Sequence, residues 1–298
     1  MGQDKFKDLR NGDVTNEEIM AAFLADKRLE GCKESTLAEY HRRLAVYYDF
    51  LKARQIRVSA VTHDDIHDFI NAMHAAGKKN QTKKNTLSTI YVFTNWGVKN
   101  GLWTVSPLTK ADFPVVVTAR IHRLTDDQLQ ELAGWLSLLQ ENLRAAFWLM
   151  IGTGARVGEV AHLTAQDVTI RDGAVYVAIH DAKWGSDRVI PITEAQAAAI
   201  VWKYRQTVPV DGQPLFRLSR RTLQFYATKF AQTSGIPFHC HLLRHTYAAR
   251  LTEQGVPITT IQYLLGHKSV AMTAHYTQSA LVDLSGITPT IDLGEDTQ

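Results

Sequence analysis

The most informative stretch of the chain is residues 239–278, which read HCHLLRHTYAARLTEQGVPITTIQYLLGHKSVAMTAHYTQ. This stretch holds five of the twelve histidines of the chain. On a helix, His241 and Arg244 are three positions apart and therefore share a face. The concentration of histidine and arginine makes the stretch the first candidate for a site of chemistry.

A further helix is predicted within the same stretch. Pro257 fits its first helical position and Gly266 fits the residue just past its end, so His267 follows directly on a helix C-terminus. Nine residues later, Tyr276 lies in a short predicted helix that Ser269 could cap. These positions bring a second histidine and a tyrosine into the candidate region.

Two segments upstream carry further candidates. In IGTGARVGEV, Arg156 follows two glycines in the predicted first turn of a helix, where backbone N–H groups and the helix dipole favour a phosphate. Glu159 lies one turn on, where its carboxylate can orient a guanidinium group. In KWGSDRVIPI, Lys183 lies at the rim of a predicted hairpin, five residues before Arg188.

At these residues the chain resembles the tyrosine site-specific recombinase (phage integrase) family. The matching motifs are GTGARVGE, KWGSDRVIPI, HLLRH, LLGH and the final Tyr276 with its preceding Thr273. Their order and spacing both fit, and the match spans roughly residues 120–280. Each motif alone is weak, whereas the full set in the right order is a strong signal.

The resemblance implies a covalent exchange of DNA strands, with Tyr276 as the nucleophile and Lys183 as the general acid. A tyrosine phenol, with a pKa of about 10, can attack a phosphodiester and form a 3′-phosphotyrosine, which a 5′-hydroxyl later displaces. Both directions stay open without ATP. The departing 5′-oxygen is a poor leaving group, and a positioned lysine can give it a proton.

The resemblance also assigns the groups around the phosphate. Arg156 and Arg244 would hold the non-bridging oxygens with permanently charged, bidentate guanidinium groups. His241 would be a base or a hydrogen-bonding partner, and His267 would stabilise the transition state or position the nucleophile. Glu159 would support Arg156. The family works without a metal, so the resemblance implies neither a metal ion nor another cofactor.

The chain is predicted to be mainly α-helical. Apolar residues at helical spacing, capping residues and glycine stops predict four helices in its first part, at about 16–30, 36–55, 62–77 and 82–100. Further on, the alternation in AVYVAIHDAKWGSDRVIPIT predicts a small antiparallel hairpin among further helices. With the resemblance, the predicted divisions are a helical core-site DNA-binding domain at 13–106, an extended linker at 107–119, an α-rich catalytic domain at 120–285 and a tail at 286–298.

Charge is segregated along the chain. The net charge of +3, from 33 basic and 30 acidic side chains, gives no reason to expect nucleic acid as a partner. By segment, however, residues 51–110 carry nine basic and three acidic groups, and residues 201–250 carry eight and one. Two basic blocks in different halves suit a two-domain clamp on a polyanion. The alternative is that each block is a solvated face.

Within these blocks and just before them, six side chains are the best candidates for contacts with DNA phosphates or a major groove. They lie on the second and fourth predicted helices and at the start of a helix in the second domain: Arg42, Arg43, Lys83, Lys84, Arg220 and Arg221. For each of them the alternative is an ordinary solvated side chain.

The expected location follows from what the sequence lacks. Cys32 and Cys240 are far apart and give no disulfide framework, which suits a reducing cytosol. No apolar run approaches the roughly 18 residues of a membrane helix, and the N-terminus has no apolar signal core. We therefore expect no membrane partner, and a cytoplasmic, nucleoid-associated protein of bacterial, phage or other mobile-element origin.

The expected function is that of a two-domain, Xer-like recombinase. The resemblance implies that it binds a specific recombination site in duplex DNA, works as a homotetramer on two such sites and passes through a Holliday junction. Two alternatives stay open. One is a DNA-binding architectural or regulatory protein with a vestigial site, and the other is a type IB topoisomerase-like DNA relaxer, which shares the chemistry.

Two histidine clusters invite a metal interpretation. His239, Cys240 and His241 are consecutive potential ligands, but zinc needs about four, and His241 already has a role in the family pattern. His63 and His67 have the spacing of ligands on one helix face. With their neighbouring aspartates, they are interpreted as a solvated first helical turn.

Two further features are interpreted as structural. IGTGARVG resembles a dinucleotide-binding loop, but that loop requires a βαβ unit, and a hairpin follows instead. His245 and His275 lie beside catalytic positions of the family pattern without matching any of them, so both are expected to serve packing.

Overall fold

The described chain divides into two units. The structure, a computed structural model, describes residues 14–116, 122–180, 187–267, 269, 270 and 273. Contacts along the backbone group the chain into an N-terminal unit, Met1–Thr118, and a C-terminal unit, Ala119–Gln298. Each unit contains a hydrophobic core of its own.

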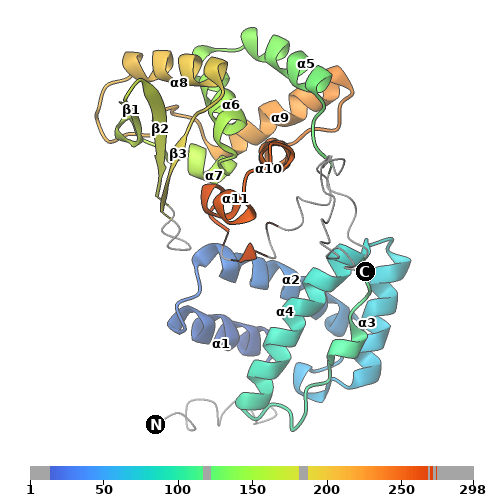
Figure 1. Ribbon diagram of the computed structural model, residues 1–298. Coiled ribbons are helices and arrows are strands. Elements are labelled where there is room, and N and C mark those ends of the chain that lie inside the picture. Colours follow the sequence, from blue (N-terminus) through green and yellow to red (C-terminus); the bar gives the residue numbers. More distant parts are fainter. Residues whose placement is uncertain (1–13, 117–121, 181–186, 268, 271–272, 274–298) are drawn as a thin grey trace, which may run out of the picture. The chain divides into compact units, whose positions relative to one another are not determined.

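The described part of the N-terminal unit, residues 14–116, is built from four α-helices (Figure 1). They are α1 (Asn16–Leu29), α2 (Glu34–Ala53), α3 (His63–Ala75) and α4 (Asn80–Lys99), with a short 3-10 helix η2 (Val58–Ala60) before α3. Thr15 and Thr62 open α1 and α3 with capping boxes, in which cap and third helical residue bond reciprocally. All four helices are predicted from the sequence, although α2 and α4 each begin two residues before the expected start.

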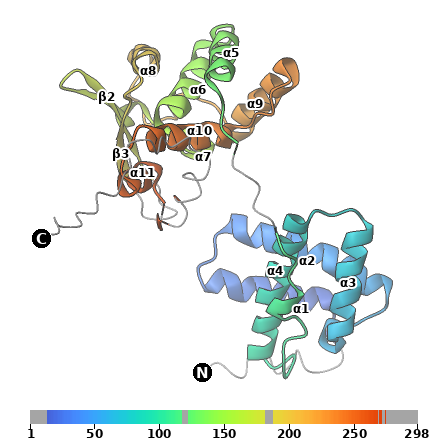
Figure 2. The same ribbon diagram turned by 45° about the vertical axis from the view of Figure 1, so that its right-hand side comes forward.

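Aromatic rings build the core of the N-terminal unit. Phe23 of α1 is fully buried, and its ring centroid lies 5.3 Å from that of Phe93 and 5.5 Å from that of Trp96, both on α4. The indole N–H of Trp96 donates to Asp26 at 2.8 Å, which satisfies the polar edge of a buried ring. Figure 2 shows α1 and α2 side by side, with α4 crossing them.

The chain after α4 stays packed on the N-terminal unit. Leu108 is 1% exposed, and the ring of Phe113 lies 6.0 Å from that of Tyr91 on α4. Between them lies a short 3-10 helix, η3 (Lys110–Asp112). The first part of the segment predicted as an extended linker is therefore packed on the N-terminal unit, because its apolar side chains contact the core of this unit.

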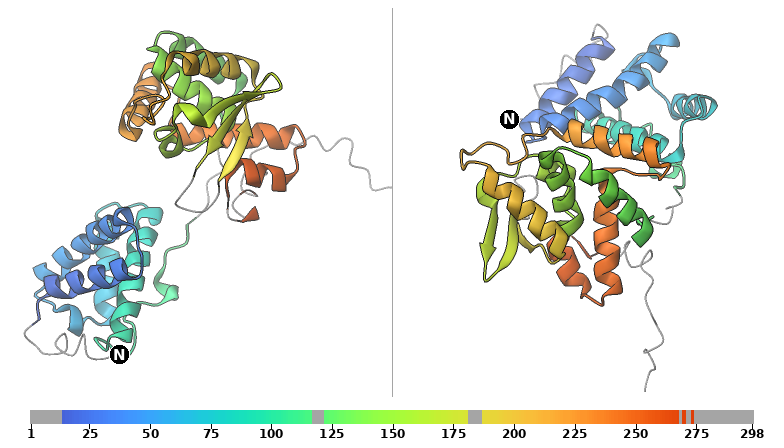
Figure 3. Two further views of the ribbon diagram at one scale, coloured as in Figure 1. Left: turned by 90° about the vertical axis from the view of Figure 1, so that its left-hand side faces the viewer. Right: turned by 90° about the horizontal axis from the view of Figure 1, so that it is seen from above.

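The described part of the C-terminal unit is also mainly helical. Its helices are α5 (Asp126–Ser137), α6 (Glu141–Thr153), α7 (Val157–Val160), η4 (Ala165–Asp167), α8 (Ala195–Thr207), α9 (Arg220–Ser234), α10 (Cys240–Glu253) and α11 (Ile258–Leu265). Phe147, Leu149 and Met150 of α6 are fully buried, which is typical of a central helix. α6 packs against α8 and α10, and Figure 3 shows both helices beside it.

A three-stranded antiparallel sheet completes this unit. Its strands are β1 (Val168–Arg171), β2 (Ala174–Ile179) and β3 (Arg188–Pro191), in the order β1-β2-β3. β2 buries Val175, Val177 and Ile179 on one face, and Val177 pairs with Ile190 of β3. The hairpin of β2 and β3 is the one that the sequence alternation predicts, and the structure confirms it.

Strand β1 is absent from the sequence prediction. It joins β2 through Asp172 and Gly173, whose φ angles of 48° and 78° are those of a two-residue hairpin turn. Asp-Gly between short apolar runs is a sign of this turn, so the signal was present in the sequence. The mainly α-helical fold with a small antiparallel sheet is confirmed. Among the described residues, no helix has both the length and the apolar character needed to cross a membrane.

Candidate active site

Arg244 of α10 is buried among backbone carbonyl groups of the C-terminal unit. Only 1% of the residue is exposed. Its Nη1 donates to the carbonyl oxygen of Gly154 at 3.1 Å, and its Nη2 donates to that of Leu265 at 2.5 Å. These carbonyls lie at the C-terminal ends of α6 and α11, where the helix dipole is negative. Acceptors at two helix ends thus compensate for the burial of a cation.

Gly154 allows α6 to end at this point. It has a left-handed conformation with φ of 63°, and a Cβ atom there would lie 2.6 Å from Cδ1 of Tyr247. Tyr247 follows Arg244 by three residues on α10. Burial raises the pKa of its phenol to about 12, although Arg188 acts in the opposite direction. Its hydroxyl is therefore protonated at neutral pH, and its ring serves packing against the glycine.

Glu159 of α7 binds two arginine side chains. One carboxylate oxygen accepts from Nη1 of Arg156 at 2.8 Å, and the other accepts from Nη2 of Arg188 at 2.9 Å. The backbone N–H of Arg156 donates to the second oxygen at 2.7 Å. Nε of Arg188 donates to the carbonyl of Leu264 at 2.8 Å, and Nη2 of Arg156 reaches the carbonyl of Gly266 at 3.4 Å.

These contacts keep Glu159 ionised. Burial alone would raise the pKa of its carboxyl group, but the bonds from Arg188 and Arg156 outweigh it and lower the pKa below its ordinary value. Glu159 therefore contacts Arg156, as the resemblance led us to expect, and also Arg188, to which the sequence analysis gave no role. The signal was a charged residue at a core-facing position of an alternating strand, since the Arg188 side chain is 1% exposed.

The position of Arg156 differs in one respect from the prediction. It lies at the N-cap of α7 rather than in the first turn, and α7 has only four residues. A helix of one turn contributes little dipole field. The guanidinium group of Arg156, rather than the helix end, is therefore the main source of positive charge at this place.

His267 follows α11 directly, as predicted. Gly266 caps that helix with φ of 62°, and His267 is 9% exposed. Its Nδ1 lies 2.9 Å from the hydroxyl oxygen of Thr273. Burial first, and then the positive charges of Arg244 and Arg156, lower the pKa of His267 to about 3. The imidazole is therefore neutral at physiological pH.

Two more histidines lie one turn apart on α10. The ring centroids of His241 and His245 are 4.5 Å apart. Partial burial lowers the pKa of each to about 4, with Arg244 next in importance for His241 and the neighbouring ring next for His245. The structure thus brings together the neutral rings of His241 and His245 and the buried cation of Arg244.

Two residues of the expected catalytic set, Lys183 and Tyr276, lie outside the described residues. The described residues nearest to Lys183 in the sequence are His180 before it and Asp187 after it. Before Tyr276, the described residues include Thr273, which is 1% exposed. Thr273, which precedes Tyr276 by three residues in the sequence, is bonded to His267.

The DNA-contact candidates of the N-terminal unit differ in accessibility. Arg42 forms two hydrogen bonds with Glu39, at 3.0 and 2.7 Å, and Arg43 also pairs with Glu39, at 2.7 Å. Lys83 is 7% exposed and lies 3.4 Å from a ring nitrogen of His74. Lys84 is exposed. Of these four, Lys84 is the one that presents an accessible charge with no carboxylate bound to it.

The candidates of the C-terminal unit are both accessible. Arg220 and Arg221 open α9 after the cap Ser219, and both are exposed without an ion pair to any described residue. Beside them lies an open groove of about 710 Å³. Its lining residues are Ala161, His162, Gln213, Pro214, Arg217, Leu218, Ser219 and Arg220.

The structure also bears on two alternatives from the sequence. Burial raises the pKa of Cys240 to about 11, and its thiol lies 3.6 Å from the carbonyl oxygen of Leu223, so it is not a thiolate ready for a metal. The glycine-containing turn at Gly154 leads from one helix into another, and the described sheet is antiparallel. Neither feature suits a dinucleotide-binding loop.

Comparison with known families matches both units. The pattern of the phage integrase family matches residues 122–281, and that of the phage integrase N-terminal SAM-like domain matches residues 22–101. The tyrosine recombinase XerC of Thermodesulfovibrio yellowstonii is 26% identical over 292 residues, covering 91% of this chain and 95% of the relative. XerC of Neisseria meningitidis serogroup B is 29% identical over 275 residues, covering 86% and 89%.

Solved structures show the same fold. A lambda integrase tetramer bound to a Holliday junction matches with a TM-score of 0.72 at 23% identity, covering 96% of this chain and 82% of that chain. The XerH site-specific recombinase in a pre-cleavage complex with its difH substrate matches with a TM-score of 0.67 at 17% identity, covering 90% and 82%. At these identities, the likeness concerns the fold.

Proposed function

Because the chain belongs to the phage integrase family, we propose that it is a tyrosine site-specific recombinase, which cuts and rejoins duplex DNA through a 3′-phosphotyrosyl intermediate. The observation that supports this most is the convergence at two successive peptide groups at the end of α11. Arg244 donates to the carbonyl of Leu265, Arg156 reaches the carbonyl of Gly266, and His267 follows. Two fixed cations and a neutral imidazole meet at the end of α11.

Such a set suits a phosphate that passes through a five-coordinate state. Arg156 and Arg244 are held by backbone carbonyls and by Glu159, so their charges are in place before the reaction begins. Charge arranged in advance at a developing oxyanion is typically worth about 10²–10³ in rate for each donor. If Thr273 donates to Nδ1 of neutral His267, the imidazole carries its N–H at Nε2, which makes this nitrogen a hydrogen-bond donor.

The remaining roles rest on the family pattern. Tyr276 attacks the phosphorus and expels the 5′-oxygen, Lys183 protonates that oxygen, and His241 assists as a base or hydrogen-bonding partner. The bond energy is kept in the phosphotyrosine, so the rejoining step, in which a 5′-hydroxyl displaces the tyrosine, needs no ATP. The reaction as written requires no metal ion and no other cofactor.

The expected partners follow from the same mechanism. Exchange between two duplexes requires four tyrosines, so we expect a homotetramer on two copies of a specific DNA site with a Holliday junction in between. Arg220, Arg221 and Lys84 are the accessible candidates for phosphate contacts, with Arg42, Arg43 and Lys83 less available in this conformation. Such a protein would act in the compartment that holds the DNA.

A covalent-trapping experiment tests the proposal. The bound sequence is first selected from a random DNA pool, and a nicked duplex of that sequence then serves as a suicide substrate. Wild-type protein is expected to form a covalent adduct, whereas Tyr276→Phe should bind the site with unchanged affinity and form none. Tyr226→Phe, which changes a packing tyrosine of α9, is the matched control and should retain adduct formation.

Two results would contradict the proposal. Adduct formation by Tyr276→Phe would remove Tyr276 as the nucleophile. Failure of the wild-type protein to trap any site that it binds would favour a DNA-binding protein without cleavage activity.

A further inference from the structure

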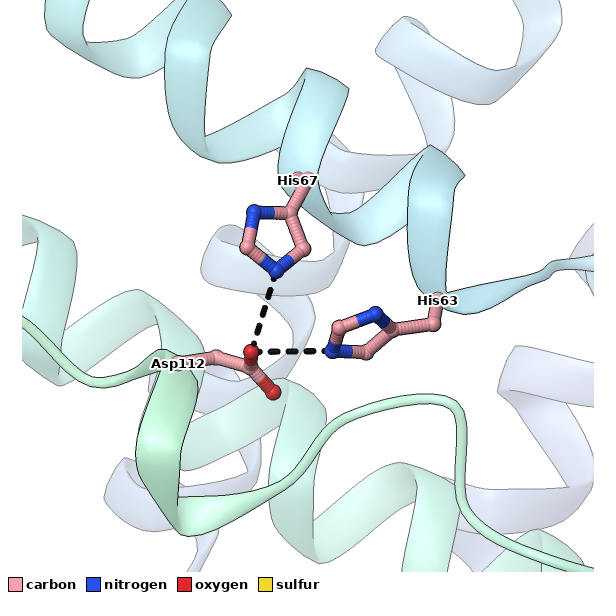
Figure 4. A group of neighbouring side chains, drawn as sticks. All are labelled: His63, His67 and Asp112. Carbon is pink, nitrogen blue, oxygen red and sulfur yellow. Dashed lines mark hydrogen bonds and ion pairs between the residues drawn. The ribbon is translucent and has the colours of Figure 1, made fainter.

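Three metal-ligating side chains meet in the N-terminal unit, within the part of the chain that the structure describes. His63 and His67 lie one turn apart on α3, and Asp112 comes from η3, 49 residues after His63 (Figure 4). Nε2 of His63 lies 3.0 Å from Oδ1 of Asp112, and Nε2 of His67 lies 3.3 Å from the same oxygen. Both rings turn the same nitrogen toward one point.

The spacing is that of ligands around a small ion. Zinc binds nitrogen and oxygen ligands at about 2.0–2.1 Å with tetrahedral geometry, which separates neighbouring ligand atoms by about 3.3 Å. The two nitrogen–oxygen distances lie at or near this value, and all three ligand atoms lie within 4.8 Å of one another. An ion can therefore enter with small side-chain adjustments.

The carboxylate of Asp112 is positioned by its own loop. Its other oxygen, Oδ2, accepts the backbone N–H of Thr109 at 2.7 Å and the hydroxyl of the same residue at 2.8 Å. Burial would raise the pKa of Asp112, but these bonds and the one from His63 outweigh it and lower the pKa. The side chain is 4% exposed and ionised, and Oδ1 faces the histidines.

The histidines are open to solvent. Their side chains are 52% and 54% exposed, so an ion from solution can reach the ring nitrogens. A neighbouring acidic residue of α3, Asp68, lies 3.6 Å from Arg54 and is not part of the cluster. The sequence suggests only a solvated helix turn at His63 and His67. The structure adds to these two histidines the buried carboxylate of Asp112, which comes from a distant segment.

We propose that His63, His67 and Asp112 form a binding site for a divalent transition-metal ion of the zinc type, with water as the fourth ligand. Imidazole nitrogen and carboxylate oxygen suit zinc and its neighbours better than magnesium or calcium, which prefer sets of oxygen ligands. The ion would join α3 to η3, the last described element of this unit. The site is far from the groups of the proposed reaction in sequence and shares none of them.

Titration of the metal-free, full-length protein tests the site. Zn²⁺ binding is measured by calorimetry, and Co²⁺ binding by the visible absorption of four-coordinate cobalt. The wild type is expected to bind one equivalent that His67→Gln and Asp112→Asn bind at least about tenfold more weakly. The second variant keeps an oxygen for Thr109, so its loop stays capped. His41→Gln, which changes an exposed histidine of α2, is the matched control and should bind like the wild type.

Thermal unfolding gives a readout that is independent of recombination. Saturating Zn²⁺ is expected to raise the midpoint of the wild type and of His41→Gln by at least about 5 °C, reversibly with a chelator, because the ion binds only the folded unit. The midpoint of His67→Gln should rise by clearly less at the same Zn²⁺ concentration, because its binding is weaker. The proposal is wrong if both ligand variants retain wild-type stoichiometry and affinity, or if the midpoints of all proteins shift equally.

Discussion

Glu159 positions two arginine side chains of the candidate site, those of Arg156 and Arg188. Each of its carboxylate oxygens accepts hydrogen bonds from both Arg156 and Arg188, and its side chain is 8% exposed. A buried ion pair adds little net stability when it is complete, but it is costly to break because the remaining charge stays buried. The carboxylate therefore matters for position and for charge balance at the same time.

Replacement of this carboxylate by an amide is expected to harm both stability and cleavage. Glu159→Gln should lower the free energy of unfolding by about 3 kcal/mol, since it removes the buried carboxylate that accepts from Arg156 and Arg188. It should also slow covalent adduct formation, because Arg156 loses its ion pair with Glu159. Urea denaturation and suicide-substrate trapping measure the two effects.

The matched control is Glu141→Gln at the start of α6, where an exposed carboxylate lies 3.8 Å from Arg144. Surface pairs of this kind are worth less than about 1 kcal/mol. Equal losses in Glu159→Gln and Glu141→Gln would contradict the role given to Glu159.

At the scale of elements, the site depends on how helices end. α6 and α11 both stop at glycines with left-handed backbone, Gly154 and Gly266, and each stop directs a carbonyl or a histidine toward the site. Short helix stops of this kind need glycine because other residues lack a favourable conformation at positive φ. The polar groups are thereby placed by backbone geometry.

A methyl group at the end of α6 is expected to be poorly tolerated. Gly154→Ala combines a positive φ with a Cβ position 2.6 Å from the Tyr247 ring, and should cost at least about 2 kcal/mol in unfolding free energy. Gly134→Ala in the middle of α5 is the matched control, because no atom lies within 4 Å of the added Cβ. It should stabilise the protein by about 0.5–1 kcal/mol. A similar effect of the two substitutions, by urea denaturation, would count against this account.

Elements with a local signal could be predicted, and those without one could not. The capping box of Thr62 and Asp65 predicts the start of α3, and the alternation of apolar and polar residues in β2 and β3 predicts their hairpin. The sequence does not predict β1, although Asp172 and Gly173 mark its turn. Its four residues are too few for a recognisable alternation of apolar and polar side chains. The packed start of the predicted linker depends on contacts with α4, which no local pattern encodes.

The same distinction holds for the candidate site. Arg156, Arg244 and His267 carry recognisable neighbours in the sequence, and the structure brings them together at the end of α11. The pairing of Arg188 with Glu159 joins residues 29 positions apart, and that of His63 with Asp112 joins residues 49 apart. Such pairs arise from the tertiary fold, so a linear sequence pattern does not reveal them.

At the scale of the whole molecule, the site histidines make folding sensitive to acid. The pKa of His267 is lowered to about 3 and those of His241 and His245 to about 4, from an ordinary value of 6.5. Below about pH 6.5, the unfolded chain therefore binds protons that the folded unit does not, so stability falls as the pH falls toward 4.

For His267 alone, the expected loss in unfolding free energy between pH 7.5 and 5 is about 2 kcal/mol. Denaturation curves across this range measure the slope, and His267→Gln should flatten it. An unchanged slope in that variant would show that His267 does not titrate as described.

For DNA binding, the distribution of charge along the chain matters more than the net charge. A net charge of +3 hides basic blocks that hold the accessible Arg220 and Arg221. Removing both with Arg220→Ala and Arg221→Ala should weaken DNA binding for all sequences and reduce the slope of log affinity against log salt by about 2. Arg42→Ala is the comparison, because Glu39 already binds this side chain. A slope equally reduced by Arg42→Ala would remove the distinction between bound and accessible arginines.

The way in which Arg244 is held has a consequence for how such a protein can evolve. Its guanidinium group donates to the backbone carbonyl oxygens of Gly154 and Leu265, and every residue type has a backbone carbonyl. Substitution at position 265 by another apolar residue leaves that acceptor unchanged, whereas position 154 admits little besides glycine. The position of the proposed phosphate-binding arginine thus depends on the path of the main chain, so the sequence around it can diverge widely while the guanidinium group stays in place.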